Sequence, residues 1–565
     1  MGGPIKIRIS YLFVAALLGT ACSSADEPFS VTDDGPAPLA LTNYVGVPDP
    51  FDSCGYDPFT VAIAADPAGW PSAEVANFYY IDPSHPASTD SDNTYGYPDK
   101  PRSTFAQFVI SEGGKVVLVG DGNTYTIGGK GRFEPAMTGT SSNQIFIEGR
   151  CTTTRPQLLK QLRFTGSTHV IVEGLMWTEN KKTASIQAGS HYITIRNSLF
   201  DGPSENVGFT SVIGISGTDS NDRSSHIVVY DNLFKDWGEN LITSPENYYH
   251  GVKPSANVTQ VWIVNNECHN LGGDCVQVGD ASIADEIRPD YVYITGNVMY
   301  NNLENCVDIK EADDIIISGN ICHSFNRALY NNTGNSSTAM VVHDDAANVW
   351  VLNNILYDIG TGIINTGGLN VHMLGNLIYD VNPVGPYDAA TAYGNGQCMH
   401  ARGTSSGVMA FNTCVSYATG INFGGQIPYL VSGNIFSERN RADGYEIMLP
   451  NSGAYTSFTG MDFNVFHNST QATQFKRGST VQDLSAWGVS TGFEVNALTL
   501  DPAFGNAGAN DFTLQGSSPA IDATGPELQV FSDFQTRYGL DIRSDINGVI
   551  RPANGTWDRG AFEAN

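Results

Sequence analysis

Short runs of apolar residues alternate with Asn, Gly and Asp along most of the chain. Between Val261 and Asp345 the sequence reads VWIVNNECHN, GGDCVQVGD, YVYITGNVMYNNLENCVDIKEADD, IIISGNICHSF and MVVHDD. The apolar runs end at Asn-containing turns, as at Asn266, Asn297 and Asn320. Short runs rich in Val, Ile and Tyr and bounded by turn residues predict β-strands.

The turn residue recurs at regular intervals, at Gly174, Asn197, Asn232, Asn266, Asn297, Asn320, Asn354, Asn376, Asn412, Asn434 and Asn464. The shortest steps are 22 and 23 residues, and the others run from 30 to 36. A unit of about 22 residues is one turn of a coil built from three short strands, and the longer steps add a loop of roughly ten residues. The sequence therefore predicts a solenoid.

Stacking explains why such short strands are stable, because strands about 4.8 Å apart pair their backbone groups with the coils above and below. Stacked Asn residues would then form an amide ladder. The pattern resembles right-handed parallel β-helix proteins of the pectate-lyase-like kind over roughly residues 76–500. We expect an all-β, single-stranded, right-handed parallel β-helix of about ten or more coils. Residues 501–565, which include DPAFGN and RPANGTWDRGAFE, resemble the C-terminal closing segment of secreted β-helices.

The N-terminus is typical of an export signal. Lys6 and Arg8 precede the apolar stretch 11–18, which is too short to span a bilayer. Residues 18–22 read LGTAC and resemble a bacterial lipobox, so we expect a signal peptide over 1–22 with a lipid at Cys22. Ordinary cleavage near Ala21 is the alternative. Residues 23–75 are predicted to be a tether and N-terminal cap. We expect a monomeric outer-membrane or cell-surface lipoprotein, or otherwise a periplasmic or secreted protein, with no membrane contact except the lipid.

Charge and cysteine content narrow the partners and the compartment. A net charge of −29 and a pI near 4.5 argue against nucleic-acid binding. An exported protein can form disulfides, and Cys54 with Cys151 is the expected pair because both lie outside the repeats. The six cysteines inside the repeats are expected to be small buried thiols.

Charged residues gather on the second strand of the repeating unit. Because alternate residues of a strand point to opposite faces, an apolar residue that points inward places the next one outward. Aligning these strands at their apolar residues gives two outward columns, which are Lys253, Gln277, Asp308, His343, Asn365, His400 and Asn422, and Ser255, Gly279, Lys310, Asp345, Gly367, Arg402 and Gly424. The sequence thus predicts a polar ribbon that the long insertions wall into a groove. A solvated surface without function is the alternative.

Cations in a groove of an acidic protein favour an anionic polysaccharide, such as one that contains uronate. The reaction that fits is β-elimination, which needs a base for the proton α to the carboxylate and a positive group for the developing charge. We expect Lys310 as the base, with a pKa lowered by Arg402 or by a bound cation. His343 and His400 are the alternative base and the leaving-group acid. Substrate contacts are expected from Lys253, Gln277, Asn365, Tyr249 and Tyr330.

Asp308 would keep Lys310 protonated unless the carboxylate binds something else. Ca²⁺ is the natural candidate because it prefers oxygen ligands. The expected ligands are Asp274 and Asp308 with Asp280 or Asp345. The resemblance implies the same, since several β-helical lyases combine a Lys base with Ca²⁺ bound by Asp residues.

Other functions remain open on the same fold. A glycoside hydrolase would recruit Asp308, Asp344 and Asp345, but successive residues such as 344 and 345 point to opposite faces of a regular strand. A uronate epimerase would share the proton abstraction. A surface adhesin or glycan-binding protein would need no catalytic group at all.

Overall fold

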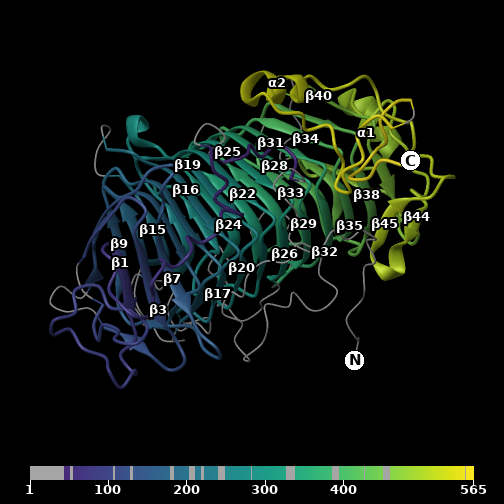
Figure 1. The fold of residues 1–565 in the computed structure, drawn as a ribbon. Coiled ribbons are helices and arrows are strands. Elements are labelled where there is room, and N and C mark those ends of the chain that lie inside the picture. Colours follow the sequence, from purple (N-terminus) through teal and green to yellow (C-terminus); the bar gives the residue numbers. More distant parts are fainter. Residues whose placement is uncertain are drawn as a thin grey trace.

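Three long parallel sheets wind around one core in the computed structural model, as Figure 1 shows. The structure describes residues 44–564 except 51–54, 106–107, 127–131, 179–182, 203–209, 218–221, 239–248, 282, 326–336, 385–393, 426, 450–457 and 554. Each turn of the chain adds one strand to every sheet, and each strand pairs in parallel with the strand one coil earlier and later. The fold is the predicted parallel β-helix.

Sheet 1 contains β1 Phe78–Ile81, β3 Lys115–Val119, β7 Ile145–Arg150, β10 Thr168–Glu173, β13 His191–Arg196, β16 Ser224–Tyr230, β19 Val258–Val264, β22 Asp290–Thr295, β25 Asp313–Ser318, β28 Ala347–Leu352, β31 Leu369–Leu374, β34 Gly407–Ala410, β37 Tyr429–Ser432 and β40 Gly460–Asp462, with β2 Val109–Ser111 and β6 Ala136–Thr138 beside them. Sheet 2 contains β4 Thr124–Tyr125, β8 Gln157–Leu158, β11 Met176–Trp177, β14 Leu199–Asp201, β17 Leu233–Lys235, β20 Glu267–His269, β23 Val298–Tyr300, β26 Ile321–Phe325, β29 Ile355–Ile359, β32 Leu377–Val381, β35 Thr413–Tyr417, β38 Ile435–Arg439 and β41 Val465–His467.

Sheet 3 contains β5 Arg132–Phe133, β9 Gln161–Thr165, β12 Ala184–Gln187, β15 Thr210–Ile215, β18 Tyr249–Pro254, β21 Val276–Val278, β24 Asn305–Lys310, β27 Thr338–His343, β30 Thr361–Thr366, β33 Gln397–Ala401, β36 Thr419–Phe423, β39 Tyr445–Leu449 and β42 Phe475–Arg477, ending in the antiparallel β43 Thr480–Gln482. The short helix α1 Leu484–Thr491 follows. The C-terminal region holds the hairpin β44 Phe504–Asn506 and β45 Asp511–Leu514, then helix α2 Gln529–Tyr538.

A ladder of buried asparagines sets the register of the coils. The main-chain N–H and the side-chain Nδ2 of each Asn donate to Oδ1 of the Asn in the next coil, at 2.9 to 3.0 Å, through Asn232, Asn266, Asn297, Asn320, Asn354, Asn376, Asn412, Asn434 and Asn464. The ladder predicted from the sequence is therefore present.

The two earliest turn positions were aligned one residue too soon. Ser198 occupies the ladder position one coil before Asn232, and Leu175 occupies the position one coil before Ser198. Asn197 and Gly174 precede these residues in the left-handed backbone region. The expectation failed because a glycine or asparagine at φ > 0 produces the same local signature as the ladder residue.

Glu494 ends the ladder at its C-terminal side. Its carboxylate accepts a hydrogen bond from Asn464 Nδ2 at 2.7 Å, and only 5% of the residue is exposed. Burial raises the pKa of Glu494 to about 8. The ladder thus ends on an acid that the fold keeps protonated at neutral pH.

The cysteines inside the repeats are paired, which contradicts the expectation of free thiols. Disulfides join Cys268 to Cys275, Cys306 to Cys322, and Cys398 to Cys414 within the core. The expectation failed because it treated burial and pairing as alternatives, although a three-strand coil brings two inward positions of one turn together. Cys151 is also disulfide-bonded, and Cys54, its expected partner, lies outside the described residues.

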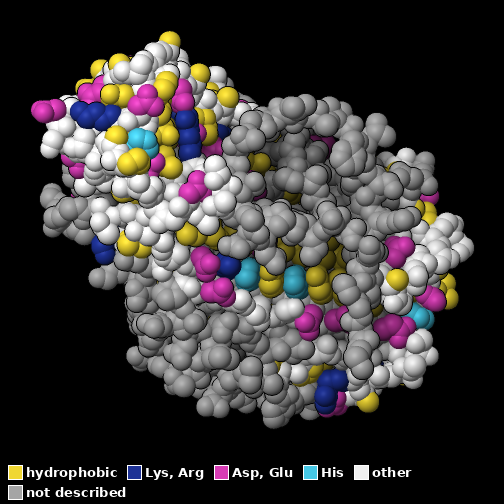
Figure 2. All heavy atoms as spheres, turned by 60° about the horizontal axis from the view of Figure 1, so that its bottom comes forward, with side chains coloured by type: hydrophobic (Ala, Val, Ile, Leu, Met, Phe, Trp, Pro, Cys, Tyr) yellow, Lys and Arg dark blue, Asp and Glu magenta, His cyan; other side chains and the backbone are white. Residues whose placement is uncertain are grey.

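The outer face of sheet 2 carries a row of stacked rings. His269, Tyr300, His323, Tyr357 and Tyr379 follow one another at centroid distances of 4.7 to 5.0 Å. Figure 2 shows histidine and apolar side chains in a line across this face. The rings face one another, so only their edges are open to solvent. This row is a packing ladder, not a platform for sugar rings.

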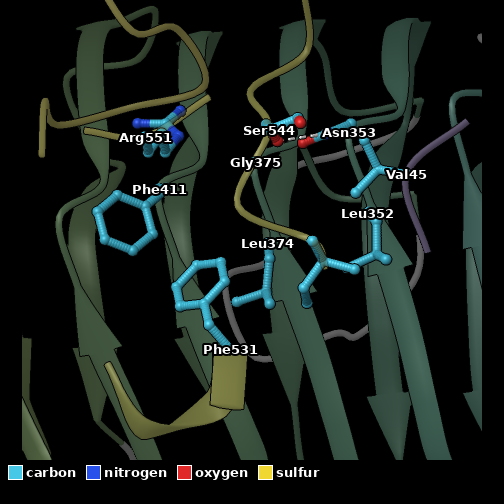
Figure 3. A pocket seen from close by; sticks show the side chains of 10 residues that line it. Val45, Leu352, Asn353, Leu374, Gly375, Phe411, Phe531, Ser544 and Arg551 are labelled. Carbon is cyan, nitrogen blue, oxygen red and sulfur yellow. Dashed lines mark hydrogen bonds between the residues drawn. The ribbon is translucent and has the colours of Figure 1, made fainter. Parts of the chain in front are cut away.

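Both terminal segments lie against the outer face of sheet 1. Trp262 donates to the carbonyl of Pro48 at 2.9 Å, and Arg537 and Tyr538 of α2 bind Asp314. Figure 3 shows a small cavity under the C-terminal segment, lined by Leu352, Leu374, Phe411, Phe531 and Arg551 among others. Sheet 1 is therefore covered here, and sheet 3 is the face that carries the polar ribbon.

No helix in the described part of the chain is long and apolar enough to cross a membrane.

Replacing Asn320 by Ala removes the acceptor for the main-chain N–H of Asn297 and the donor to Asn354. Buried groups left without partners cost about 1–3 kcal/mol each, so we expect the free energy of unfolding to fall by about 3 kcal/mol. Denaturant titration measures it. Asn506→Ala is the control, since Asn506 is exposed on the C-terminal hairpin. Equal effects of the two substitutions would contradict a structural role for the ladder.

Glu494→Gln keeps the carbonyl acceptor at the ladder end but cannot ionise. The carboxyl has an ordinary pKa near 4.5 and a folded pKa of about 8. Between these pH values the unfolded chain loses a proton that the folded chain keeps, so wild-type stability falls as pH rises. We expect the variant to match the wild type at pH 4 and to be more stable at pH 8, by about 4 kcal/mol. A stability difference that does not change with pH in thermal melts would refute the assignment.

Candidate functional site

The outer face of sheet 3 carries the predicted ribbon, with a different register in its middle. Gln277, Asp308, Val341, Ile364, His400 and Asn422 align in one outward column. Lys310 and His343 pair in the next column. The sequence alignment placed His343 in the column of Asp308. It failed because Val341 and Ile364 are apolar on the outward face, which removes the alternation that would fix the register.

This register error also placed Asn365, a predicted substrate contact, on the wrong face of its strand. Asn365 pairs with Val342 and Ala401, which point inward, and it is fully buried. Its side chain donates to the Gly368 carbonyl and to the Tyr429 hydroxyl, at 2.9 and 2.7 Å. The prediction that Asn365 faces a groove is therefore wrong.

Lys310 and His343 share the carboxylate of Asp308. The Lys310 ammonium lies 3.0 Å from Oδ2, and His343 Nε2 lies 2.7 Å from Oδ1. Asp308 is buried, with 7% of its side chain exposed, whereas Lys310 and His343 keep 23% and 21%. The strands β24 and β27 thus hold a lysine and a histidine, both partly exposed, against one buried carboxylate.

The pKa values in this triad follow from the shared charge. Burial would lower the pKa of Lys310, but the negative charge of Asp308 outweighs it and raises that pKa. The same balance raises the pKa of His343 above 6.5, because burial is outweighed by the hydrogen bond to Asp308. Burial opposes ionisation of Asp308, yet the hydrogen bonds from His343 and Lys310 keep its pKa low. Lys310 is therefore protonated, not neutral as a base would have to be.

His343 also meets a second carboxylate. Its Nδ1 lies 3.0 Å from Oδ2 of Asp344, a residue in the turn after β27 with 38% of its side chain exposed. Nε2 is thus bound to the buried Asp308, and Nδ1 faces the more exposed Asp344.

A second titratable cluster lies beside the triad, and the sequence analysis found only one of its members. Oδ2 of the buried Asp274 lies 3.1 Å from His250 Nδ1. Ligand atoms of His250, Asp274 and Glu304 all lie within 4.8 Å of one another. Burial, with the charges of Asp274 and Asp308, raises the pKa of Glu304 well above its ordinary value.

His250 and Glu304 were missed because they precede a corner in the strand. Both Cys306 and Val307 belong to the core, so two successive residues point inward there and alternation does not extend to residue 304. The dipeptide His250-Gly251 before the apolar Val252 was the available signal, since a glycine allows close approach of chains.

The expected Ca²⁺ ligands do not come together as a set. Asp308 binds Lys310 and His343, while Asp280 pairs with Lys253 at 2.5 Å. Asp345 is exposed in the turn after β27. Asp274 instead lies near His250 and Glu304. Among the described residues, these three form the group of potential metal ligands that lie close together.

The remaining predicted residues divide between ribbon and core. Lys253 is half-buried on the ribbon, and Gln277 is buried, with its Nε2 donating to the Gly279 carbonyl at 3.4 Å. Tyr249 is fully buried in the core and stacks on Trp237 at 5.3 Å, so the prediction that it contacts substrate is wrong. Tyr249 is the first residue of strand β18, and its side chain points into the core. Tyr330 lies outside the described residues.

His400 and Arg402 lie on the ribbon beyond the triad. His400 is 2% exposed, and neither ring nitrogen has a hydrogen-bond partner within the described part of the structure. Burial and the neighbouring Arg402 charge lower its pKa to about 3. His400 is therefore neutral and a weak base, whereas Arg402 is exposed.

No known family model matches the chain, and no curated protein matches it. Among solved structures it is similar to the surface adhesin PfbA of Streptococcus pneumoniae, with 13% identity, a TM-score of 0.41, and coverage of 56% of this chain and 87% of that one. It is also similar to the alginate lyase AlyF-OU02 in complex with G6, at 11% identity and a TM-score of 0.38, covering 87% and 97% of the two chains. A third is the GH136 lacto-N-biosidase from Eubacterium ramulus, at 12% identity and a TM-score of 0.37, covering 71% and 67%. At these identities the likeness concerns the fold and does not choose among their activities.

Asp308→Asn tests the electrostatics of the triad. Without the Asp308 carboxylate, Asp344 alone opposes the effects of burial and of the Lys310 charge on His343, so the pKa of His343 should fall. Titration of the imidazole resonances by NMR measures this change. His323 on sheet 2 serves as an internal reference, because its neighbours do not include Asp308. An unchanged His343 pKa would show that Asp308 does not control it.

Proposed function

We propose that the protein is a polysaccharide lyase that cleaves a uronate-containing chain by β-elimination on the outer face of sheet 3. The observation that carries this proposal is the Asp308 triad, in which one buried carboxylate holds Lys310 and His343 at the protein surface. On a chain with a net charge of −29, the Lys310 ammonium is the local positive charge that can receive an anionic sugar, with His343 beside it.

Lys310 supplies positive charge in this proposal. Its raised pKa keeps it protonated, so it suits the uronate carboxylate and the enolate-like charge that develops there. This role replaces the one expected from the sequence, in which a neutral Lys310 removes the proton.

His343 is the better base. Asp308 fixes Nε2 and raises the pKa of the ring, which increases its strength as a base near neutral pH. Nδ1, next to the more exposed Asp344, takes the proton α to the carboxylate. The bond from the β carbon to the glycosidic oxygen then breaks, a carbon–carbon double bond forms, the leaving oxygen takes a proton from water, and His343 releases its proton to solvent. A bound divalent cation would add positive charge at the carboxylate.

Export belongs to the same proposal. The signal-like residues 1–22 and the lipobox at Cys22 support a monomeric, lipid-anchored protein outside the cytoplasm. Disulfides within the repeats agree with an oxidising compartment.

The activity test uses alginate, pectate, glycosaminoglycans and ulvan as substrates. A lyase creates an unsaturated uronyl end that absorbs in the ultraviolet, and kcat/KM should rise with pH as His343 loses its proton. We expect Lys310→Ala and His343→Gln each to lower kcat/KM on the accepted substrate by about 100-fold or more. Lys235→Ala and His323→Gln on sheet 2 are the matched controls and should be silent.

Other outcomes select other functions. Reducing ends without ultraviolet absorbance would indicate a hydrolase, and inversion at the uronate carbon without cleavage would indicate an epimerase. Polysaccharide binding that survives both ribbon substitutions, with no product from any substrate, would indicate an adhesin and refute the proposal.

A further inference from the structure

The cluster of His250, Asp274 and Glu304 is short of positive charge. Asp274 is 1% exposed, and no Lys or Arg among the described residues forms an ion pair with it or with Glu304. The nearby ammonium of Lys310 is already engaged by Asp308. Oδ1 of Asp274 accepts two hydrogen bonds from Asn305, whereas Oδ2 faces His250, so a cation at the cluster would stabilise the charge on this side of the carboxylate.

The contact between His250 and Asp274 points to the same need. Nδ1 of His250 lies 3.2 Å from the main-chain N–H of Asp274 and 3.1 Å from the carboxylate Oδ2 of the same residue. A ring nitrogen carries either a lone pair or a proton. One of the two contacts therefore joins groups of like polarity, unless a cation lies between the nitrogen and the carboxylate.

Gly273 lies close to this nitrogen. A Cβ at Gly273 would lie 3.0 Å from His250 Nδ1 and 2.9 Å from the main-chain nitrogen of Tyr249, so a side chain there would force one of them to move. The residue is not among the glycines with positive φ, so the backbone conformation does not require glycine there. The close approach of the chain to His250 does.

The distances suit a metal ion. Two ligands that bind one ion at about 2.1 Å lie roughly 3.0 to 3.4 Å apart in tetrahedral or octahedral geometry. His250 Nδ1 and Asp274 Oδ2 are 3.1 Å apart, and the Glu304 carboxylate completes the group within 4.8 Å.

The donor set does not match Ca²⁺, the ion expected from the sequence. Ca²⁺ takes six to eight oxygen ligands, whereas this cluster offers an imidazole nitrogen and two carboxylates. One nitrogen and two carboxylates suit first-row transition ions such as Zn²⁺ or Mn²⁺.

We propose that His250, Asp274 and Glu304 bind a divalent first-row transition-metal ion near Lys310, where the chain enters β21 and β24 of sheet 3. The site goes beyond the proposed lyase activity and does not depend on it, because the ion can be measured without any polysaccharide. If that activity is present, the ion lies where it adds positive charge to the face that receives the uronate.

The test begins with the full chain stripped by a chelator and dialysed. Zn²⁺, Mn²⁺, Co²⁺ and Ca²⁺ are then titrated separately by calorimetry, with Mn²⁺ also followed by electron paramagnetic resonance and Co²⁺ by visible absorption. We expect one equivalent of Zn²⁺ to bind at least tenfold more tightly than Ca²⁺, and the Co²⁺ spectrum to show nitrogen ligation.

Glu304→Gln is the main variant, since it removes a ligand without changing the size of the side chain, and it should weaken Zn²⁺ binding at least tenfold. Asp280→Asn is the matched control, because Asp280 lies on the same ribbon but pairs with Lys253. Thermal melts without metal confirm that both variants fold. Zn²⁺ affinity that is unchanged in Glu304→Gln, no Zn²⁺ binding by the wild type, or tighter binding of Ca²⁺ than of Zn²⁺ would each overturn the proposal.

Discussion

The structure depends on backbone pairing between identical short strands in successive coils. A strand of three to six residues, such as β21 or β24, has no stable fold of its own. Stacking gives each strand two partners, and the buried asparagines fix how far each coil is shifted along the next. Because the register is held inside, the outward positions of sheet 3 can carry residues that contribute nothing to packing. The Asp308 triad occupies such positions, and the His250 cluster lies beside it, where the chain enters β21 and β24.

The fold could be predicted because the residues that determine it recur at regular intervals in the sequence. Asn266, Asn297 and Asn320 mark the same turn in successive coils, and their spacing reports the length of a coil. The site was harder to predict because it depends on the register of each individual strand of sheet 3. Lys310 and His343 were placed on the correct face, while Asn365 was inverted by the apolar, outward-facing Ile364. Alternation cannot reveal a register where both faces of a strand are apolar.

Two further features had no local signal. At the corner before β24, the successive residues Cys306 and Val307 both point inward. Alternation along the strand therefore could not predict the direction of Glu304. The roles within the triad depend on charge balance and not on residue type. The sequence led to the expectation that Arg402 or a bound cation lowers the pKa of Lys310, but the charge of Asp308 keeps Lys310 protonated and makes His343 more basic. Such a balance is set by distances that only the three-dimensional arrangement provides.

The central claim is that sheet 3, and no other face, receives an acidic sugar at the Asp308 triad. A crystal structure of the His343→Gln variant soaked with oligouronates tests this claim most directly. The account predicts a sugar across β24 and β27 with its carboxylate against the Lys310 ammonium. A sugar bound on sheet 1 or sheet 2, or on sheet 3 away from Lys310, would contradict it.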